Sequence, residues 1–228
     1  MTRALILAAG RGERMRPLSD AVPKPLLAVG GKPLIVWQVE RLVAGGITGI
    51  VVNHSHLGAQ IEAALGDGSR FGAAIRHSRE EEALETAGGV AHALHLLGDR
   101  PFVVVSGDIW TEFPYRSLLA RAAEVESGYP AHCAHFVLVD NPPFHPGGDM
   151  ALLEGRIARE GARLTYANIG VFHPKCFAGL DPDRRLALFP WSFAMVEAGR
   201  VSGEHFHGRW ANLGTPRDLE QLDKELSP

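Results

Sequence analysis

The sequence predicts an α/β fold, in which a mixed and mainly parallel sheet is flanked by helices in a Rossmann-like arrangement. Short apolar runs alternate with segments of helical spacing through residues 1–110. Strands that alternate with helices form parallel sheets covered on both faces. The length of 228 residues, 46% of them hydrophobic, is also enough for one sizeable core.

The first half of the chain carries this alternation most clearly. Its expected strands are the apolar runs 4–8, 47–53, 74–77 and 102–106, and its expected helices are 34–43, 60–65 and 89–97. Glycines at Gly45-Gly46 and Gly66 follow two of these helices, where glycine commonly ends a helix.

The pattern changes after about residue 130, where the expected strands are shorter. They cover 135–139, 151–153, 156–158 and 167–172, and turn residues such as Pro142-Pro143 and Gly147-Gly148 separate them. This region extends the same sheet in a mixed manner. We find no linker, repeat or low-complexity segment, and we expect one domain over residues 1–228.

Composition excludes several classes of protein. A net charge of -3 argues against a nucleic-acid partner, which needs a basic surface. The two cysteines, Cys133 and Cys176, are too few for a disulfide framework. No segment approaches the roughly 20 apolar residues that span a bilayer, and the apolar run at 4–9 is too short for a signal peptide. We expect a cytoplasmic protein without a membrane partner, and we favour a monomer.

A glycine-rich, basic loop follows the first strand. Gly10 and Gly12 allow backbone N–H groups to approach phosphate oxygens closely, and Arg11, Arg14 and Arg16 add charge and paired donors. Residues 1–33 hold six basic groups against two acidic ones. A local positive patch on an acidic protein suits a small polyanion.

A lysine between two prolines, Pro23-Lys24-Pro25, follows this loop. The prolines stiffen the backbone that presents the ammonium group. Two other phosphate loops are excluded. The Walker A pattern is absent, and Met15 occupies the place where a dinucleotide-binding loop would have its third glycine.

The segments 7–18 and 23–26 together resemble the signature of the sugar-phosphate nucleotidylyltransferases. The resemblance continues through 31–34, 84–89, Gly107-Asp108 and 213–216, and so covers nearly the whole chain. Segments 108–111, 139–142 and 202–205 are most similar to a short bacterial branch of the family. This branch implies UTP and N-acetylmuramate 1-phosphate as the substrates. The resemblance further implies a nucleotide-binding half over about 1–130 and a sugar-binding half over about 131–228.

The reaction implied is attack by a sugar 1-phosphate oxygen on the α-phosphorus of UTP. A phosphate monoester is largely dianionic at pH 7, so it needs no general base. The enzyme must hold two polyanions together and neutralise developing charge. By resemblance, Arg14, Lys24 and Asp108 are the catalytic residues. The triphosphate is expected to bind at Ala9, Gly10, Arg11, Gly12, Glu13, Arg14 and Lys24.

A magnesium site is expected at Asp108, which ends a buried strand, because ligands of open α/β sheets bind at strand carboxyl ends. The family's second metal carboxylate usually stands where this chain has Asn212. The Asn212 amide oxygen can still bind Mg²⁺, but without a charge. Either Asp108 carries the ion alone, or another acid such as Glu204 compensates.

Base and sugar recognition are assigned to residues elsewhere along the chain. Asn53, Thr86 and Gly88 are expected at the base, with backbone groups of Gly88-Gly89 reading its edge. Ser106, Asp140, Asn141 and Glu204 are expected at the sugar. Asn168 and Gly170 match the family's sugar-side strand loosely.

Two alternatives remain open. The chain could transfer a thymidylyl, guanylyl or cytidylyl group to another sugar phosphate, or it could be a nucleotide-binding regulator without activity, given Asn212. The close histidine pairs, 54/56, 132/135 and 205/207, are interpreted as strand or surface histidines, because zinc sites need three or four suitably spaced ligands. Glu80-Glu81-Glu82 is expected to be a solvated turn, and Trp191 and Phe193 are expected to pack in the core.

Overall fold

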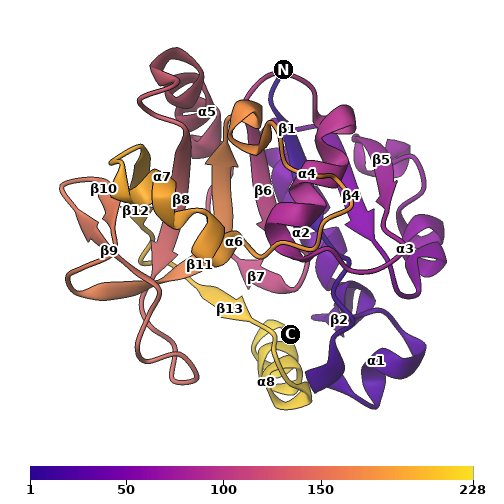
Figure 1. Cartoon of the computed structure of the whole chain (residues 1–228). Coiled ribbons are helices and arrows are strands. Elements are labelled where there is room, and N and C mark those ends of the chain that lie inside the picture. The colour runs from indigo at the N-terminus through magenta and orange to yellow at the C-terminus, as the bar shows by residue number, and fades with distance from the viewer. Residues whose placement is uncertain (228) are drawn as a thin grey trace.

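A nine-stranded sheet organises the molecule (Figure 1). The computed structural model describes residues 1–227. The strand order is β5-β4-β1-β6-β11-β8-β12-β10-β9. Strands β5, β4, β1 and β6 are parallel, and β11 runs antiparallel between β6 and β8. The predicted mixed sheet is therefore confirmed, with four parallel and five antiparallel strand pairings. The strands are β1 (Arg3–Leu7), β4 (Gly49–His54), β5 (Ala74–Arg79), β6 (Phe102–Ser106), β8 (Ala134–Val139), β9 (Met150–Leu153), β10 (Arg156–Ala158), β11 (Arg163–Phe172) and β12 (Val201–His205).

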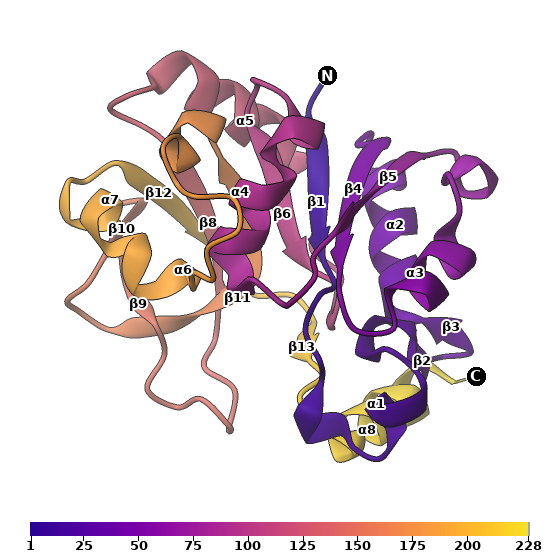
Figure 2. The ribbon, with the colours of Figure 1, turned by 45° about the vertical axis from the view of Figure 1, so that its right-hand side comes forward.

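Helices cover both faces of this sheet (Figure 2). Successive strand residues point to opposite faces, so Leu5 and Ile6 of β1 belong to different apolar clusters. One cluster joins the sheet to α2 (Leu34–Ala44), α3 (Gly58–Leu65) and α5 (Ser117–Gly128). The other joins it to α4 (Glu85–Leu97), η4 (Pro174–Phe177), α6 (Leu188–Trp191) and α7 (Phe193–Glu197). Trp191 and Phe193 pack against this second cluster, as predicted.

A small subassembly lies beyond the carboxyl ends of the parallel strands, where the last helix of the chain packs against residues 28–29, while the N-terminus lies at the opposite end of the molecule (Figure 2). Helix α8 (Pro216–Leu226) packs there, and Thr215 and Asp218 form a capping box at its start. The Asp223 carboxylate accepts a 2.8 Å hydrogen bond from Gly30 N. The other elements are η1 (Glu13–Met15), α1 (Leu18–Ala21), η2 (Lys24–Leu26), β2 (Ala28–Val29), β3 (Lys32–Pro33), η3 (Ser69–Phe71), β7 (Ile109–Thr111) and β13 (Trp210–Asn212).

Some element boundaries differ from the sequence-based expectation. Helix α4 begins at Glu85, four residues earlier than expected, and β11 extends back to Arg163. Helices α5 and α8 were not expected. In α8 three leucines, Leu219, Leu222 and Leu226, form a narrow apolar face, and Leu222 is buried.

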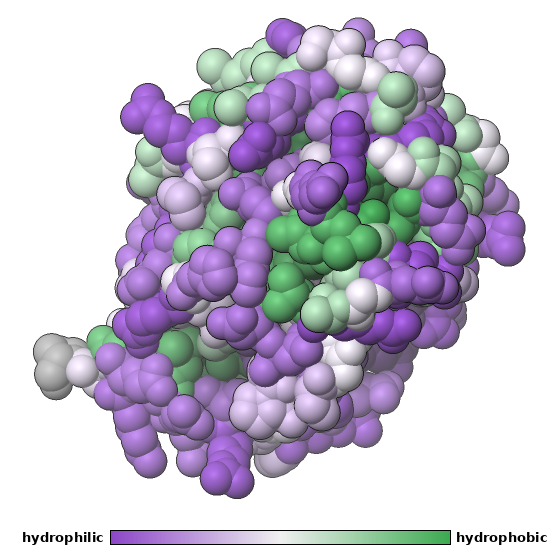
Figure 3. All heavy atoms as spheres, turned by 90° about the vertical axis from the view of Figure 1, so that its left-hand side faces the viewer, coloured by the Kyte–Doolittle hydropathy of each residue, from purple (hydrophilic) through white to green (hydrophobic). Residues whose placement is uncertain are grey.

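The second half of the sheet curls back on itself. Strand β9 pairs with β10 and also with β11, so these strands enclose part of the second core. Figure 3 views this side and shows an apolar area surrounded by polar residues. Leu153, at the end of β9, is 53% exposed. Among the described helices, none has the length and apolar character that crossing a membrane requires.

Candidate active site

A cleft of about 850 Å³ opens at the carboxyl ends of β1, β4 and β6. It lies where ligands of open α/β sheets bind. Eleven of the sequence-predicted site residues line it: Ala9, Gly10, Arg11, Gly12, Glu13, Arg14, Lys24, Asn53, Thr86, Ser106 and Asp108. Five others do not: Gly88, Asp140, Asn141, Glu204 and Asn212.

The basic loop forms one wall of this cleft and is held at both ends. At its start, Ala8 N donates a 2.7 Å hydrogen bond to Asn53 Oδ1, and further along Ser19 Oγ donates to Gly12 O at 2.8 Å. Within the described residues, no protein acceptor takes the N–H groups of residues 10–12. The loop therefore presents free amide donors beside the exposed Arg11 and Arg14 side chains.

Gly12 has a specific reason to be glycine. Its φ of 65° is in the left-handed region, which side chains disfavour. A Cβ at this position would lie 3.0 Å from Lys24 Cβ. The bend at Gly12 thus lets the loop pack directly against Lys24.

An ion pair between Lys24 and Asp108 forms the floor of the cleft. Lys24 Nζ lies 2.5 Å from Asp108 Oδ2. The lysine side chain is 9% exposed and the aspartate 32% exposed. The pair joins η2 to the turn between β6 and β7, with Pro25 beside it in the cleft wall. A buried cation and a carboxylate are therefore side by side where the phosphates are expected.

Asn53 supports the cleft from behind. Its Oδ1 accepts from Ala8 N, and its Nδ2 donates to Glu80 Oε1 at 2.6 Å. Glu80 Oε2 accepts from Leu84 N at 2.9 Å. The Asn53 amide is thus committed to protein partners, and it connects the basic loop to the segment before α4.

The expectation that Glu80 lies in a solvated turn is wrong, because its side chain belongs to this network. Glu80 is 5% exposed, whereas Glu81 and Glu82 are exposed. Burial raises the pKa of Glu80, while the hydrogen bonds from Leu84 and Asn53 partly oppose that effect.

Asn212 lies beside Asp108 in the strand pairing, and its side-chain oxygen is free to take a ligand. Strand β13 pairs with β7 so that Asn212 is opposite Ile109, and Leu213 N donates to Asp108 O at 3.1 Å. Asn212 Oδ1 is buried and has no hydrogen-bond partner among the described residues. Amide and carboxylate oxygens are ligand types that Mg²⁺ prefers.

The segment at the start of α4 contributes a different set of groups from those expected. Thr86 lines the cleft, but Gly88 N donates to Leu186 O at 2.9 Å, so this amide is not free to read a base. A Cβ on Gly88 would lie 2.5 Å from Arg184 O. Gly88 therefore allows the segment around 184–186 to pack across α4.

That packing brings Arg185 to the cleft, which sequence reasoning missed. Its Nη2 donates to Glu85 Oε1 at 2.6 Å, and both residues line the cleft. Glu85 has a φ of 65°, which is rare for a non-glycine residue. No spacing in the sequence indicates this contact, since one hundred residues separate the two partners.

The sugar-side residues are more dispersed. Ser106 lines the cleft at the end of β6, and the pairing of Ile169 with Val105 places Asn168 close to it on β11. Asp140 is exposed beyond β8 and lies 3.0 Å from His205 Nε2. The Asn141 side chain is engaged with Pro146 O, Arg163 O and Thr165 Oγ1, and so holds its own loop.

Glu204 lies outside the cleft lining. It lies on β12, separated from β6 by β11 and β8, and its Oε1 is 3.0 Å from His135 Nε2. The hydrogen bond with His135 lowers the pKa of Glu204, although burial opposes it. The suggestion that Glu204 replaces a metal carboxylate at Asn212 is therefore wrong, because the two positions lie on separate parts of the fold.

A family model and two full-length relatives match this chain. The nucleotidyl transferase family model matches residues 3–143. The N-acetylmuramate alpha-1-phosphate uridylyltransferase of Neisseria meningitidis serogroup B is 47% identical over 225 residues, which covers 96% of each chain. The protein of the same name from Caulobacter vibrioides is 35% identical, over 94% of this chain and 92% of its own.

Solved structures share the fold. A candidate glucose-1-phosphate thymidylyltransferase from Bacillus anthracis, in complex with a sucrose, superposes with a TM-score of 0.86 at 21% identity and covers 99% of this chain and 95% of its own. HddC from Yersinia pseudotuberculosis superposes over the whole of both chains with a TM-score of 0.77 at 20% identity.

Proposed function

The chain belongs to the nucleotidyl transferase family, and we propose that it transfers a uridylyl group from UTP to N-acetylmuramate 1-phosphate. The products are a UDP-sugar and pyrophosphate. The observation that carries the proposal is the cleft in which a free-amide loop, Arg14, Lys24 and Asp108 converge. The two relatives of this name, which match almost end to end, support this choice of substrates. Such a reaction would return a cell-wall sugar to peptidoglycan synthesis in the cytoplasm.

The bond changes need no protein base. A non-bridging oxygen of the sugar phosphate bonds to the α-phosphorus, and the bond between that phosphorus and the oxygen leading to the β-phosphate breaks. The electron pair leaves on pyrophosphate. The nucleophile is already largely dianionic at pH 7. Catalysis then depends on alignment and on neutralising charge as it moves.

The residues of the cleft divide this task. The free N–H groups of residues 10–12 and the Arg14 guanidinium bind the β- and γ-phosphates, which become the leaving group. Lys24 is 7% exposed, so its charge acts on the α-phosphate in a poorly screened setting. Without substrate, Asp108 neutralises this buried ammonium group. With substrate bound, the Lys24 ammonium group interacts with the phosphates as well as with Asp108.

Nucleotidyltransferases use a divalent metal, and we propose Mg²⁺ here. The Asp108 carboxylate and the unpartnered Asn212 oxygen would hold it. When bound, the ion would supply additional positive charge to the triphosphate. With only one carboxylate in the pair, the site has one negative charge less than an Asp/Asp pair, which favours weaker metal binding.

A second candidate is guanylyl transfer to mannose 1-phosphate. The mannose-1-phosphate guanyltransferase of Hypocrea jecorina is 31% identical over 95% of this chain. This chain spans 62% of that relative's length, however. Guanylyl transfer is the second candidate because the identity is 31% instead of 47% and because this chain lacks a counterpart to the rest of that relative.

The test is a panel of UTP, dTTP, GTP and CTP crossed with N-acetylmuramate, N-acetylglucosamine, glucose and mannose 1-phosphates, assayed by pyrophosphate release with and without Mg²⁺. We expect the highest kcat/KM for UTP with N-acetylmuramate 1-phosphate, and none without a divalent ion. A preference for GTP with mannose 1-phosphate would favour the second candidate. Absence of turnover in every combination would favour a regulatory nucleotide binder.

A further inference from the structure

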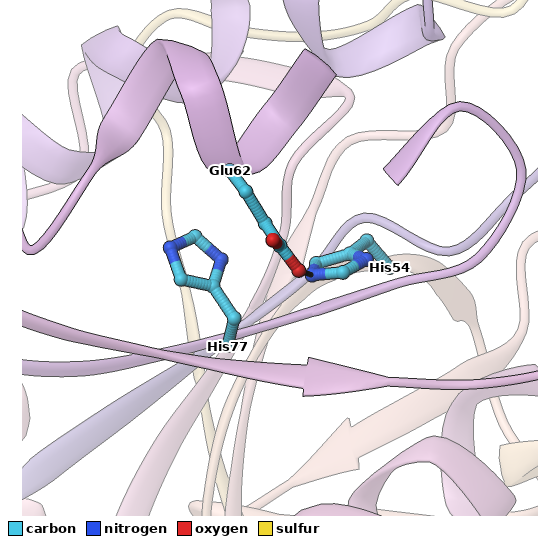
Figure 4. Close-up of side chains that lie close together, drawn as sticks. All are labelled: His54, Glu62 and His77. Atoms are coloured by element: carbon cyan, nitrogen blue, oxygen red, sulfur yellow. Dashed lines mark ion pairs between the residues drawn. The ribbon is translucent and has the colours of Figure 1, made fainter. Parts of the chain in front are cut away.

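Two histidines and a glutamate meet on the opposite side of β4 and β5 from α4. His54 ends β4, His77 is on β5, and Glu62 is on α3. One ligand atom from each of the three lies within 4.8 Å of the other two. Figure 4 shows the Glu62 side chain extending from α3 toward the two imidazole rings. The sequence-based interpretation of His54 considered only its neighbour His56 and missed this grouping.

His54 presents a buried nitrogen without a hydrogen-bond partner. The side chain is 4% exposed, and Nε2 lies 3.0 Å from Glu62 Oε1. Despite this distance, Nε2 makes no hydrogen bond with any described residue. Burying a polar nitrogen without a partner is costly. A cation between Nε2 and the carboxylate would give this nitrogen a partner.

His77 supplies a second nitrogen, and its tautomer is fixed. Its Nε2 lies 2.9 Å from Gly66 O, and a carbonyl can only accept, so Nε2 carries the proton. In the neutral ring, Nδ1 therefore keeps its lone pair, and Nδ1 is buried without a partner. Metal-bound histidines usually donate their other N–H to a carbonyl or carboxylate in this way.

We propose that His54, Glu62 and His77 form a binding site for one divalent transition-metal ion of the zinc class. Two imidazoles and one carboxylate are a donor set that zinc accepts, with water completing four-coordination. Mg²⁺ prefers oxygen ligands and would not compete strongly. This site is separate from the oxygen-rich pair Asp108 and Asn212.

Small movements would bring the three side chains to metal-binding distance. Zinc–nitrogen bonds of about 2.0–2.1 Å place ligand atoms about 3.4 Å apart, so small side-chain rotations close the present gaps. Arg79 donates to both Glu62 oxygens, but its side chain is 76% exposed and can release Oε1 while remaining bonded to Oε2.

The ion would connect three elements that support the nucleotide cleft. His54 directly follows Asn53, whose amide joins the basic loop to Glu80. Linking β4, β5 and α3 at this point would stiffen that edge of the sheet. Gly58 leaves room for the imidazole, because a Cβ there would lie 2.2 Å from His54 Nδ1.

The test is titration of chelator-treated full-length protein with Zn²⁺, and separately with Co²⁺, in the presence of excess Mg²⁺ to occupy the oxygen-rich site. We expect one equivalent of Zn²⁺ to bind and to raise the Tm. Bound Co²⁺ should show the intense visible band of four-coordinate cobalt. His77→Gln and Glu62→Gln should each weaken Zn²⁺ binding at least tenfold, whereas the exposed control His95→Gln should not.

Three results would overturn the proposal. They are the absence of binding at 100 μM Zn²⁺, affinity unchanged in His77→Gln, or binding that is lost instead in the double variant His205→Gln with His207→Gln. That second grouping, with Asp140, is the other metal-competent cluster of the described residues. His77 is only half-buried, and the Tm of metal-free His77→Gln shows whether its loss of binding reflects the ligand or the fold. These readouts do not depend on the proposed transferase activity.

Discussion

Replacing Lys24 with methionine is the sharpest perturbation of the cleft. The substitution removes the ammonium group but keeps an unbranched chain to pack against Gly12. A poorly screened cation about 4 Å from a phosphate charge contributes about 4 kcal/mol at an effective dielectric constant of about 20. Removing one preorganised electrostatic group from an active site costs about 2.7–4 kcal/mol. The two figures agree, and kcat should fall by about 10²–10³-fold.

The fold should survive this change. Asp108 loses its partner, but it is 32% exposed and can be hydrated. Removing one partner of an ion pair is strongly destabilising when the remaining charge is buried, whereas the Asp108 carboxylate reaches solvent. We expect a Tm within a few degrees of the parent and a larger effect on kcat than on KM for UTP.

The assay is steady-state pyrophosphate release, with thermal unfolding monitored by circular dichroism. Lys224→Met on α8 is the matched control, because Lys224 is exposed and lies outside the cleft. If Lys24→Met keeps more than a tenth of the parental kcat while folded, the electrostatic role assigned to Lys24 is refuted.

Three further predictions concern the surroundings of this pair. Gly12→Ala should lower the free energy of unfolding by about 1–2 kcal/mol, because residue 12 has a positive φ. The added Cβ would lie 3.0 Å from Lys24 Cβ and displace the lysine, so kcat/KM should fall more than tenfold. Unchanged kinetics would contradict this prediction. Burial raises the folded-state pKa of Glu80, so the folded protein holds this proton more tightly than the unfolded chain. Its contribution to stability is then present at low pH and is lost as pH rises through the raised pKa. When the free energy of unfolding is measured by denaturant titration between pH 4 and 7, it should depend less on pH in Glu80→Gln than in the parent, whereas Glu81→Gln should behave like the parent. Asn212→Asp should lower the Mg²⁺ concentration for half-maximal activity about tenfold, since about 1.4 kcal/mol of added attraction is one factor of ten. Activity that appears only in this variant would mean that the parent is a regulatory binder.

The parts of the site that follow a strand directly could be predicted from the sequence. The glycines and arginines after β1 and the Gly-Asp pair after β6 are short motifs whose roles follow from neighbouring residues alone. The topology of parallel strands brings their carboxyl ends to one edge. That is why the basic loop, Asp108 and Ser106 line the same cleft.

The other contacts depend on register and packing over long sequence separations. Glu80 is one of three consecutive glutamates, and only the folded position of Asn53 shows that it is buried. Arg185 reaches the cleft because the segment around 184–186 crosses α4. Glu204 was expected at the sugar, yet the strand order places it on β12, beside His135.

Side-chain direction was the other property that the sequence could not provide. Asn53 was expected to contact the base, but both ends of its amide are bonded to the protein. His54 and His77 are 23 residues apart, and their juxtaposition follows from the parallel pairing of β4 with β5, in which Val52 is opposite His77.

The central claim is tested most directly by following oxygen atoms through one reaction. N-acetylmuramate 1-phosphate labelled with ¹⁸O at its three non-bridging phosphate oxygens would be incubated with UTP and Mg²⁺, and the products analysed by mass spectrometry. We predict equimolar UDP-sugar and pyrophosphate, with all three labels in the UDP-sugar and none in the pyrophosphate. Label in the pyrophosphate, or the absence of UDP-sugar, would contradict attack by the sugar phosphate on the α-phosphorus of UTP.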